Sequence, residues 1–251
     1  MNFLKWVIRP YLYTQYHISK LARTGSFGKK TAVYRKAQYQ KTGNFIKDGL
    51  FAHHVKQFHE SSCSVATIAS IINVLLEKQG RLPEMPLTQQ DLLETVKTAH
   101  WKERMSDNGY KGRRGLPLPV LGEVVRGSLD IYGISYKSLE IIQVSADPEK
   151  SKAMKKALRT RLEQFETRGD CILIAHFDQG SVLPELHIPH ISPVGGFDRA
   201  SGKVTFLDVD PDQAYPYQVS FDTFYTSLAS NYNPIFRHFG YAEGGYVVIQ
   251  L

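Results

Sequence analysis

The sequence predicts an α+β fold in which helices come first and strands follow. Apolar residues recur at helical spacing through much of the first 170 residues. Beyond residue 170 the apolar positions form short β-like runs that are separated by turns. Helices followed by a run of strands is the order expected of an α+β protein. At 251 residues, with 42% hydrophobic and 22% charged, the chain can bury a sizeable core as one large domain or two small ones.

The most informative stretch is an apolar run that directly follows a cysteine. The apolar residues at 65–76 recur at helical spacing and cover a wide face, which predicts a buried helix. Gly80 is its expected stop, and Ser61 or Ser62 is its expected N-cap. Cys63, one of only two cysteines, would lie in the first turn. There the helix dipole and the unpaired backbone N–H groups favour thiolate over thiol.

Three further helices are expected before the strands begin. Thr88, with Asp91 three residues later, resembles a capping box. Gly133 is an expected helix stop, and Pro148 suits the first position of a helix. The expected helices cover about 88–99, 118–132 and 147–168, and the polar, glycine-rich segment 102–117 is expected to be a loop.

Most of the β-like runs lie in the C-terminal part of the chain. Val204–Val209 follows His190–Phe197 across the glycine-containing turn 198–203, which suits a hairpin. Cys171 lies inside an apolar run and is expected to belong to the core. A last helix is expected from its N-cap Ser220 to about residue 230. The expected strands cover 134–139, 171–177, 190–197, 204–209 and 246–251.

The excess positive charge is concentrated at the N-terminus. Residues 1–50 hold ten Lys or Arg against one acid, a net charge of +9. Because the whole chain carries +7, the remaining residues sum to −2. We therefore divide the chain into a basic N-terminal extension, 1–45, and a domain, 46–251. The extension also holds bulky apolar side chains, so it could lie on an anionic membrane surface or pack on the domain. Pro10 interrupts any long amphipathic helix and favours packing. Nucleic acid is not an expected partner, because no recognition motif accompanies the charge.

Several features favour a cytoplasmic location. Two cysteines cannot form a disulfide framework, and no Cys-x-x-Cys pair indicates structural zinc. Arg9 and Pro10 interrupt the first apolar run, so the N-terminus lacks a signal-peptide pattern. No stretch approaches the roughly 18 consecutive apolar residues of a membrane-spanning helix. We therefore expect a cytoplasmic protein with reduced thiols, the alternative being peripheral contact with a membrane through the extension.

Four residues form a candidate catalytic constellation. A cysteine nucleophile needs a base to take its proton, and the base needs a group that orients it. His190 opens one expected strand and Asp208 ends the next, so pairing of these strands can bring imidazole and carboxylate together. Gln57, six residues before Cys63, is an amide donor that can complete an oxyanion hole with the Cys63 backbone N–H. The chain order Cys, His, Asp is that of papain-like enzymes.

The segment His190–Val209, with the sequence HISPVGGFDRASGKVTFLDV, resembles the phytochelatin synthases. In that family the spacing from histidine to aspartate is eighteen and that from glutamine to cysteine is six, as from His190 to Asp208 and from Gln57 to Cys63 here. Gly49-Leu50-Phe51 and Cys171–His176 are also similar to their family counterparts, and the similarity covers roughly residues 45–225. The resemblance implies a papain-like fold, with a helical lobe that carries the cysteine and a sheet lobe that carries histidine and aspartate.

The resemblance also implies a substrate and a reaction. In the family the γ-Glu-Cys unit of glutathione, or of its metal thiolate with zinc or cadmium, is transferred to the cysteine with loss of glycine. The acyl group then passes to water or to a second glutathione, and no other cofactor is required. The sequence contains no Cys-rich C-terminal metal-sensing domain, so hydrolysis is expected rather than polymer synthesis. The family's arginine three residues after the aspartate is missing, since Pro211 stands there between Asp210 and Asp212, and Ser64 replaces a family glycine.

Other interpretations of these residues remain open. The enzyme could be a peptidase or acyltransferase that acts on another peptide or isopeptide, as the missing arginine encourages. Alternatively, the protein could be a non-catalytic binding module in which Cys63 is a buried hydrophobic residue and His190 a core histidine. Asp210 competes with Asp208 for the role of the acid, because strand alternation would place both on one face. Gln57 could be an ordinary surface glutamine.

The remaining histidines raise a metal site as a further alternative. They are His53, His54 and His59, close in sequence to Cys63, and His187, close to His190. Neither group has a Cys-x-x-Cys or His-Glu-x-x-His frame, so we expect no dedicated metal site. His187 is expected to be a loop residue beside the active site.

Overall fold

The computed structural model describes residues 10–11, 14, 17–18, 21–22, 35–36, 39–183, 188–229, 241 and 244–251. The predicted basic extension, 1–45, therefore lies largely outside the described residues. The helices are α2 (Phe45–Ala52), α3 (Cys63–Lys78), α4 (Gln89–Thr95), α5 (Trp101–Met105), α6 (Leu118–Ile131), α7 (Pro148–Arg168) and α8 (Phe221–Ala229), with short 3₁₀ turns η2 (Thr98–His100) and η3 (Gln179–Ser181). The strands are β1 (Arg35–Lys36), β2 (Ser138–Gln143), β3 (Cys171–Asp178), β4 (Pro189–Asp198), β5 (Lys203–Phe206), β6 (Tyr217–Ser220) and β7 (Gly245–Gln250).

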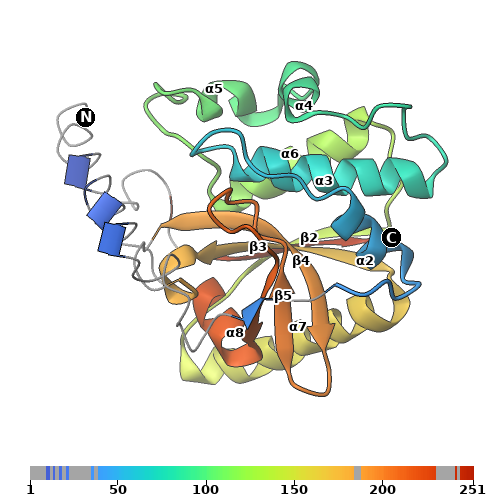
Figure 1. Ribbon diagram of the computed structural model, residues 1–251, viewed down its shortest axis with the longest axis vertical. Helices are drawn as coiled ribbons and strands as arrows, with labels where there is room; N and C mark the ends of the chain where they lie inside the picture. Colours follow the sequence, from blue (N-terminus) through green and yellow to red (C-terminus); the bar gives the residue numbers. More distant parts are fainter. Residues whose placement is uncertain are drawn as a thin grey trace.

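The strands form one antiparallel sheet in the order β1-β6-β5-β4-β3-β7-β2. Figure 1 shows α3, α4, α5 and α6 gathered on one side of the molecule, and α7 and α8 on the other side of the sheet. The first group is the helical lobe, and the sheet with α7 and α8 is the sheet lobe. The predicted α+β class is confirmed.

Helix α3 begins at Cys63, as its apolar periodicity predicts, and every residue from 64 to 76 is buried. The N-cap is Ser62, but its side chain makes no capping hydrogen bond to α3. Its hydroxyl instead closes the turn before the helix, because it donates to the His59 carbonyl at 2.8 Å and accepts from the His59 N–H at 2.9 Å. The Thr67 hydroxyl donates to the Ile191 carbonyl at 3.1 Å, which fixes α3 against β4. The start of α3 therefore lies beside the strand that carries His190.

The other predicted helices are found where they were expected, but some differ in where they end. The capping box of Thr88 and Asp91 is present, and the Ser220 hydroxyl accepts from the Thr223 N–H at the start of α8. The helix expected over 88–99 ends at Thr95, because the next residue, Val96, is extended, with φ −89° and ψ 108°. Ala99 and His100 then take positive φ angles of 54° and 55° that an α-helix cannot contain. The segment 102–117, expected to be a loop, begins with the last four residues of α5.

The strand predictions need two corrections in position and two additions. The strand expected at 134–139 is β2, four residues later, because Ile134 is buried in the turn after α6 and pairing with β7 fixes the strand at Ser138–Gln143. The strand expected at 204–209 covers only Lys203–Phe206. β1, at the edge of the sheet, and β6, next to it, have only two and four residues, too few for the sequence pattern to indicate them.

The sequence predicts no membrane-spanning helix, and the structure tests this only for the helices that it describes. Within the described ranges, no helix has both the length and the apolar character that a bilayer crossing requires.

Candidate active site

Cys63 is the first residue of α3 and is half-buried. Its position follows from the tight turn before it, in which the Ser62 N–H donates to the His59 carbonyl at 3.0 Å. Cys63 also interacts with His190, because its side chain contributes to the raised pKa of the imidazole. The structure thus brings the predicted nucleophile and the predicted base together from two lobes.

His190 and Asp208 form a buried pair. His190 is 4% exposed and Asp208 is fully buried. The imidazole Nε2 donates to Asp208 Oδ1 at 2.7 Å, which leaves Nδ1 as the ring nitrogen for Cys63. The edge of the His190 ring also meets Phe177, with the ring centroids 5.4 Å apart. A carboxylate on one ring nitrogen fixes the tautomer and the orientation of the other.

Two further donors fix the carboxylate of Asp208. The Tyr217 hydroxyl donates to Oδ2 at 2.6 Å, and the Asp210 N–H donates to Oδ1 at 2.9 Å. Tyr217 reaches this carboxylate because β6 pairs with β5 and places Tyr217 opposite Phe206, two residues before Asp208. The acid is therefore held from three directions, and Asp210 contributes its backbone rather than its carboxylate.

The electrostatics favour a charged pair. Burial disfavours the carboxylate, but the charge of His190 and the hydrogen bonds from His190, Tyr217 and Asp210 lower the pKa of Asp208 to about 2. Burial also disfavours the imidazolium, yet the charge and hydrogen bond of Asp208, with those of Cys63, raise the pKa of His190 well above 6.5. At neutral pH the imidazolium and the carboxylate are thus the favoured forms.

Gln57 lies beside the acid. Its backbone N–H donates to the carbonyl of Val209, the residue after Asp208, at 2.8 Å. The side chain is half-buried, and its Oε1 is buried without a hydrogen-bond partner, which is costly in a folded protein.

Comparison with protein families decides the family. Residues 26–235 match the model of the phytochelatin synthase family. The chain belongs to the phytochelatin synthase family. The match extends beyond the 45–225 over which the sequence shows its resemblance, and the two-lobed α+β structure is that of the papain-like fold expected from it. A comparison with curated proteins found no significant match. Family membership supports a glutathione-related, cysteine-dependent acyltransferase or peptidase activity in general.

In this phytochelatin synthase family member, sequence reasoning missed Tyr217 and Lys56. Tyr217 lies eight residues beyond the motif, and only strand pairing brings it to Asp208. Lys56 precedes Gln57, and its ammonium group donates to the carbonyls of Asp208 and Gln213 at 2.5 and 2.6 Å. No local pattern marks either residue.

Cys171 is in the core as predicted, at 1% exposure, and burial raises the pKa of its thiol to about 12. His187 lies outside the described residues.

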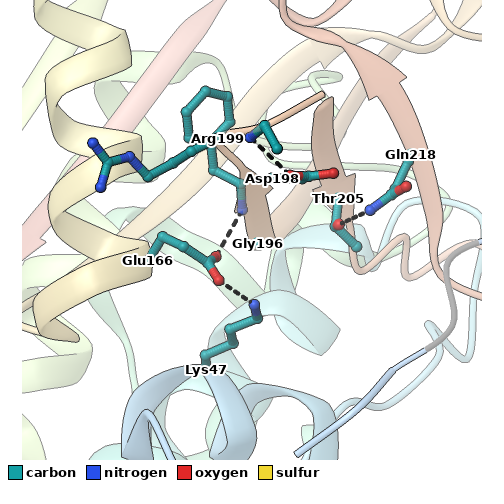
Figure 2. Close-up of a pocket in the computed structure, with 9 residues that line it drawn as sticks. Lys47, Glu166, Gly196, Asp198, Arg199, Thr205 and Gln218 are labelled. Carbon is teal, nitrogen blue, oxygen red and sulfur yellow. Dashed lines mark hydrogen bonds and ion pairs between the residues drawn. The ribbon is translucent and has the colours of Figure 1, made fainter. Parts of the chain in front are cut away.

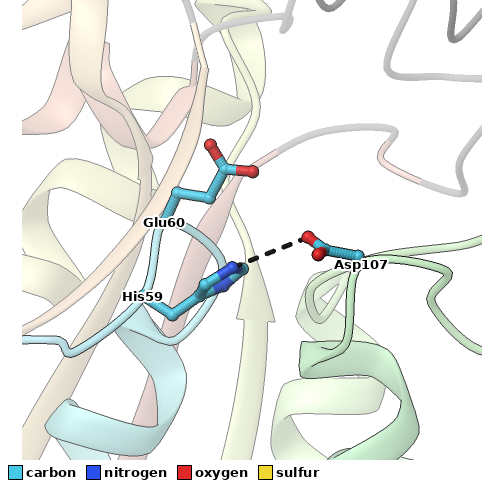
Figure 3. A group of neighbouring side chains, drawn as sticks. All are labelled: His59, Glu60 and Asp107. Atoms are coloured by element: carbon cyan, nitrogen blue, oxygen red, sulfur yellow. Dashed lines mark ion pairs between the residues drawn. The ribbon is translucent and has the colours of Figure 1, made fainter.

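One of the histidines considered as a metal ligand, His59, lies close to two carboxylates in the structure. His59, from the expected cluster, meets Glu60 and Asp107, with one ligand atom from each within 4.8 Å of the others (Figure 3). The Arg114 guanidinium already pairs with Glu60 at 2.7 Å and lies 3.9 Å from Asp107. A bound cation would compete with this guanidinium for the same carboxylates, so the group does not by itself indicate a metal site.

A pocket of about 340 Å³ lies at the far end of β4. Figure 2 shows Lys47 and Glu166 paired at its wall, with a second bond from the Phe197 N–H to Glu166 at 2.9 Å. The pocket begins at Gly196, six residues and roughly 20 Å along the strand from His190. The Lys47–Glu166 pair, with the bond from Phe197 to Glu166, therefore connects α2 and α7 to the sheet. The pocket is separate from the candidate active site.

Proposed function

We propose that this protein cleaves a glutathione-like thiol peptide through an acyl-enzyme on Cys63. One observation carries the proposal: Cys63, at the start of α3, interacts with His190, whose imidazole is paired with the buried Asp208 at 2.7 Å. Membership of the phytochelatin synthase family supports the choice of substrate. The substrate could be the free peptide or its zinc or cadmium thiolate.

The proposed first step forms a thioester and releases glycine. The Cys63 thiolate attacks the carbonyl carbon of the γ-Glu-Cys unit, and the carbonyl electrons move to its oxygen. The Cys63 N–H and the Gln57 amide donate to this oxyanion. The C–N bond then breaks, and the His190 imidazolium gives its proton to the leaving amine of glycine.

The second step restores the enzyme. Neutral His190 takes a proton from water while the water oxygen attacks the thioester. The C–S bond breaks, which releases γ-Glu-Cys and returns Cys63 to the thiolate beside the imidazolium. Asp208 remains ionised throughout, because its pKa is about 2, and it holds the imidazole in position. A second glutathione that replaced water would instead give a longer peptide.

The test is to incubate the wild type and Cys63→Ala with glutathione, with and without zinc or cadmium. Intact-mass measurement would show an adduct on the wild type alone, and free glycine would appear only with the wild type. The products, γ-Glu-Cys or a longer peptide, identify the acceptor. Full glycine release by Cys63→Ala would overturn the proposal.

A second candidate is a peptidase or acyltransferase for another peptide. It is favoured by Asp210 and Asp212, which flank Pro211 at the position where the family has its arginine. Alkylation of Cys63 with iodoacetamide separates the cases, since an activated thiol reacts well below pH 8. Rapid alkylation without glycine release would favour another substrate. An inert Cys63 without release would favour a binding module.

A further inference from the structure

Helix α5 is attached directly to the residue beside the nucleophile. Trp101 is fully buried, and its indole N–H donates to the Ser64 hydroxyl at 3.1 Å. The same hydroxyl donates to the Met105 sulfur at 3.9 Å. The first and last residues of α5 thus both contact Ser64, which follows Cys63. The residues between them are held next to the first turn of α3.

Arg104 lies between these two anchors and is half-buried. Its Nε–H donates to the Ala99 carbonyl at 2.9 Å, and its guanidinium carbon lies 5.5 Å from the centre of the Tyr110 ring. Among the residues that the structure describes, no carboxylate lies within ion-pair distance of this guanidinium. A half-buried guanidinium normally pairs with an acid. Because Arg104 has no such partner among the described residues, its outer N–H groups are available for an anionic ligand.

The support for Arg104 is built from the surrounding loop. Ala99 and His100 both have positive φ angles, which cost energy in residues other than glycine. This bend turns the Ala99 carbonyl toward Arg104 and the His100 ring onto Tyr110, with centroids 3.9 Å apart and planes 9° apart. The ring that Arg104 covers is thus itself fixed. The guanidinium is held in place before any ligand arrives.

Tyr241 connects Arg104 with Cys63. Its ring is almost completely buried, and its hydroxyl donates to the Arg114 carbonyl at 3.3 Å. Burial raises the pKa of this hydroxyl, the charge of Cys63 raises it further, and the charges of Arg104 and Arg114 lower it. Contacts of the same loop agree with this, because the Gly115 N–H donates to the Arg104 carbonyl at 3.2 Å. The guanidinium of the preceding residue, Arg114, donates to the Ser61 hydroxyl, two residues before Cys63. Arg114 is already paired with Glu60, which leaves Arg104 as the guanidinium without an acid.

We propose that Arg104 binds a carboxylate of the acyl-donor peptide and determines specificity for substrates with a free carboxylate. The inference rests on the proposed function, and it assigns to α5 the anion-binding role that Asp210 and Asp212 cannot perform. A guanidinium forms two parallel hydrogen bonds with a carboxylate, so it can orient the peptide as well as attract it.

The test compares glutathione with its diethyl ester, in which both carboxylates are blocked. Wild type is expected to prefer glutathione over the diester by about 10- to 100-fold in kcat/KM, the size expected of a charge-assisted contact. In Arg104→Ala this preference should largely disappear, through a higher KM for glutathione. Arg104→Lys, which keeps the charge but not the paired donors, should retain part of it. The rate of Cys63 alkylation by iodoacetamide, without substrate, should stay unchanged.

Arg113→Ala is the matched control, because Arg113 is an exposed cation of the same loop. It should keep the full preference for glutathione. An equal preference in wild type and Arg104→Ala, with glycine release intact, would overturn the inference and leave the proposed function standing. Absence of Cys63-dependent glycine release from the wild type would instead overturn the proposed function. If Arg104→Ala fails to fold, an unchanged preference in Arg104→Lys would count against the paired contact.

Discussion

At the scale of single residues, Asp208 differs from Asp210 in what surrounds it. Asp208 accepts from His190, from Tyr217 and from a backbone N–H, and its pKa falls to about 2. Burial and the nearby charge of Asp208 raise the pKa of Asp210, although Gln179 donates to it at 2.8 Å. Two carboxylates two residues apart thus have opposite shifts. The one with more donors keeps its charge and pairs with His190.

Tyr217 supplies a donor whose removal should be measurable. In Tyr217→Phe, Asp208 Oδ2 loses its 2.6 Å hydrogen bond inside the core. We expect a loss of about 1–3 kcal/mol in the free energy of unfolding. We also expect the acid limb of kcat/KM to move to higher pH, because the pKa of Asp208 rises when a donor to its charged form is lost. Urea unfolding and a pH–rate profile measure the two effects.

Tyr225→Phe is the control for this change. Tyr225 also donates its hydroxyl to an oxygen, the Ser145 carbonyl at 2.8 Å, but away from the candidate active site. Tyr225→Phe should lower the free energy of unfolding without moving the acid limb of kcat/KM. An acid limb that stays in place in Tyr217→Phe would show that this hydroxyl does not tune Asp208.

At the scale of elements, the segment 54–57 joins the two lobes at the candidate active site. His54 Nε2 donates to the Leu207 carbonyl at 3.1 Å, and the Gln57 N–H donates to the Val209 carbonyl. Between them the Lys56 ammonium group donates to two carbonyls of the segment after β5. The segment that carries Gln57, the proposed oxyanion donor, is thus connected to the segment that carries Asp208. A shift of one segment would displace the other.

Lys56→Met should loosen this connection. The change leaves the carbonyls of Asp208 and Gln213 without the Lys56 donor and removes a cation that interacts with the charges of Asp208 and Asp210. We expect a lower melting temperature and a several-fold lower kcat with little change in KM, because positioning rather than substrate binding is lost. Thermal unfolding and steady-state kinetics test this.

Lys152→Met, at an exposed position of α7, removes the same charge without the same contacts. It should leave both quantities near wild type. A Lys56→Met protein with normal kcat would contradict the positioning role. Alkylation of Cys63 should remain rapid in both variants, since the contact between Cys63 and His190 does not involve Lys56.

At the scale of the whole molecule, local sequence patterns fix some features and pairing between distant segments fixes others. The apolar period predicts α3 and the place of Cys63, and the His190–Asp208 spacing predicts a pair that the structure brings to 2.7 Å. The role of Tyr217 depends on the pairing of β6 with β5. That of Lys56 depends on irregular backbone between residues 207 and 216, which no period describes. The position of β2 likewise depends on its pairing with β7.

Buried histidines should make the folded state sensitive to acid. Burial lowers the pKa of His54 and that of His176 to about 4 in each case, although each ring donates to a backbone carbonyl. Between pH 6.5 and 4 the unfolded chain therefore binds protons on these residues that the folded protein does not. By linkage, the free energy of unfolding falls as the pH falls through this window. His190 does not oppose the trend, because it is protonated in both states there.

The expected slope approaches about 1.4 kcal/mol per pH unit for each of the two histidines in the middle of the window, where the unfolded histidines are protonated and the folded ones are not. His54→Asn should reduce the slope by about half. His100→Asn, at an exposed position, should leave it unchanged. Urea unfolding at pH values from 4.5 to 7 measures the slope directly. If the wild type were equally stable across that range, neither histidine would be held neutral by the fold.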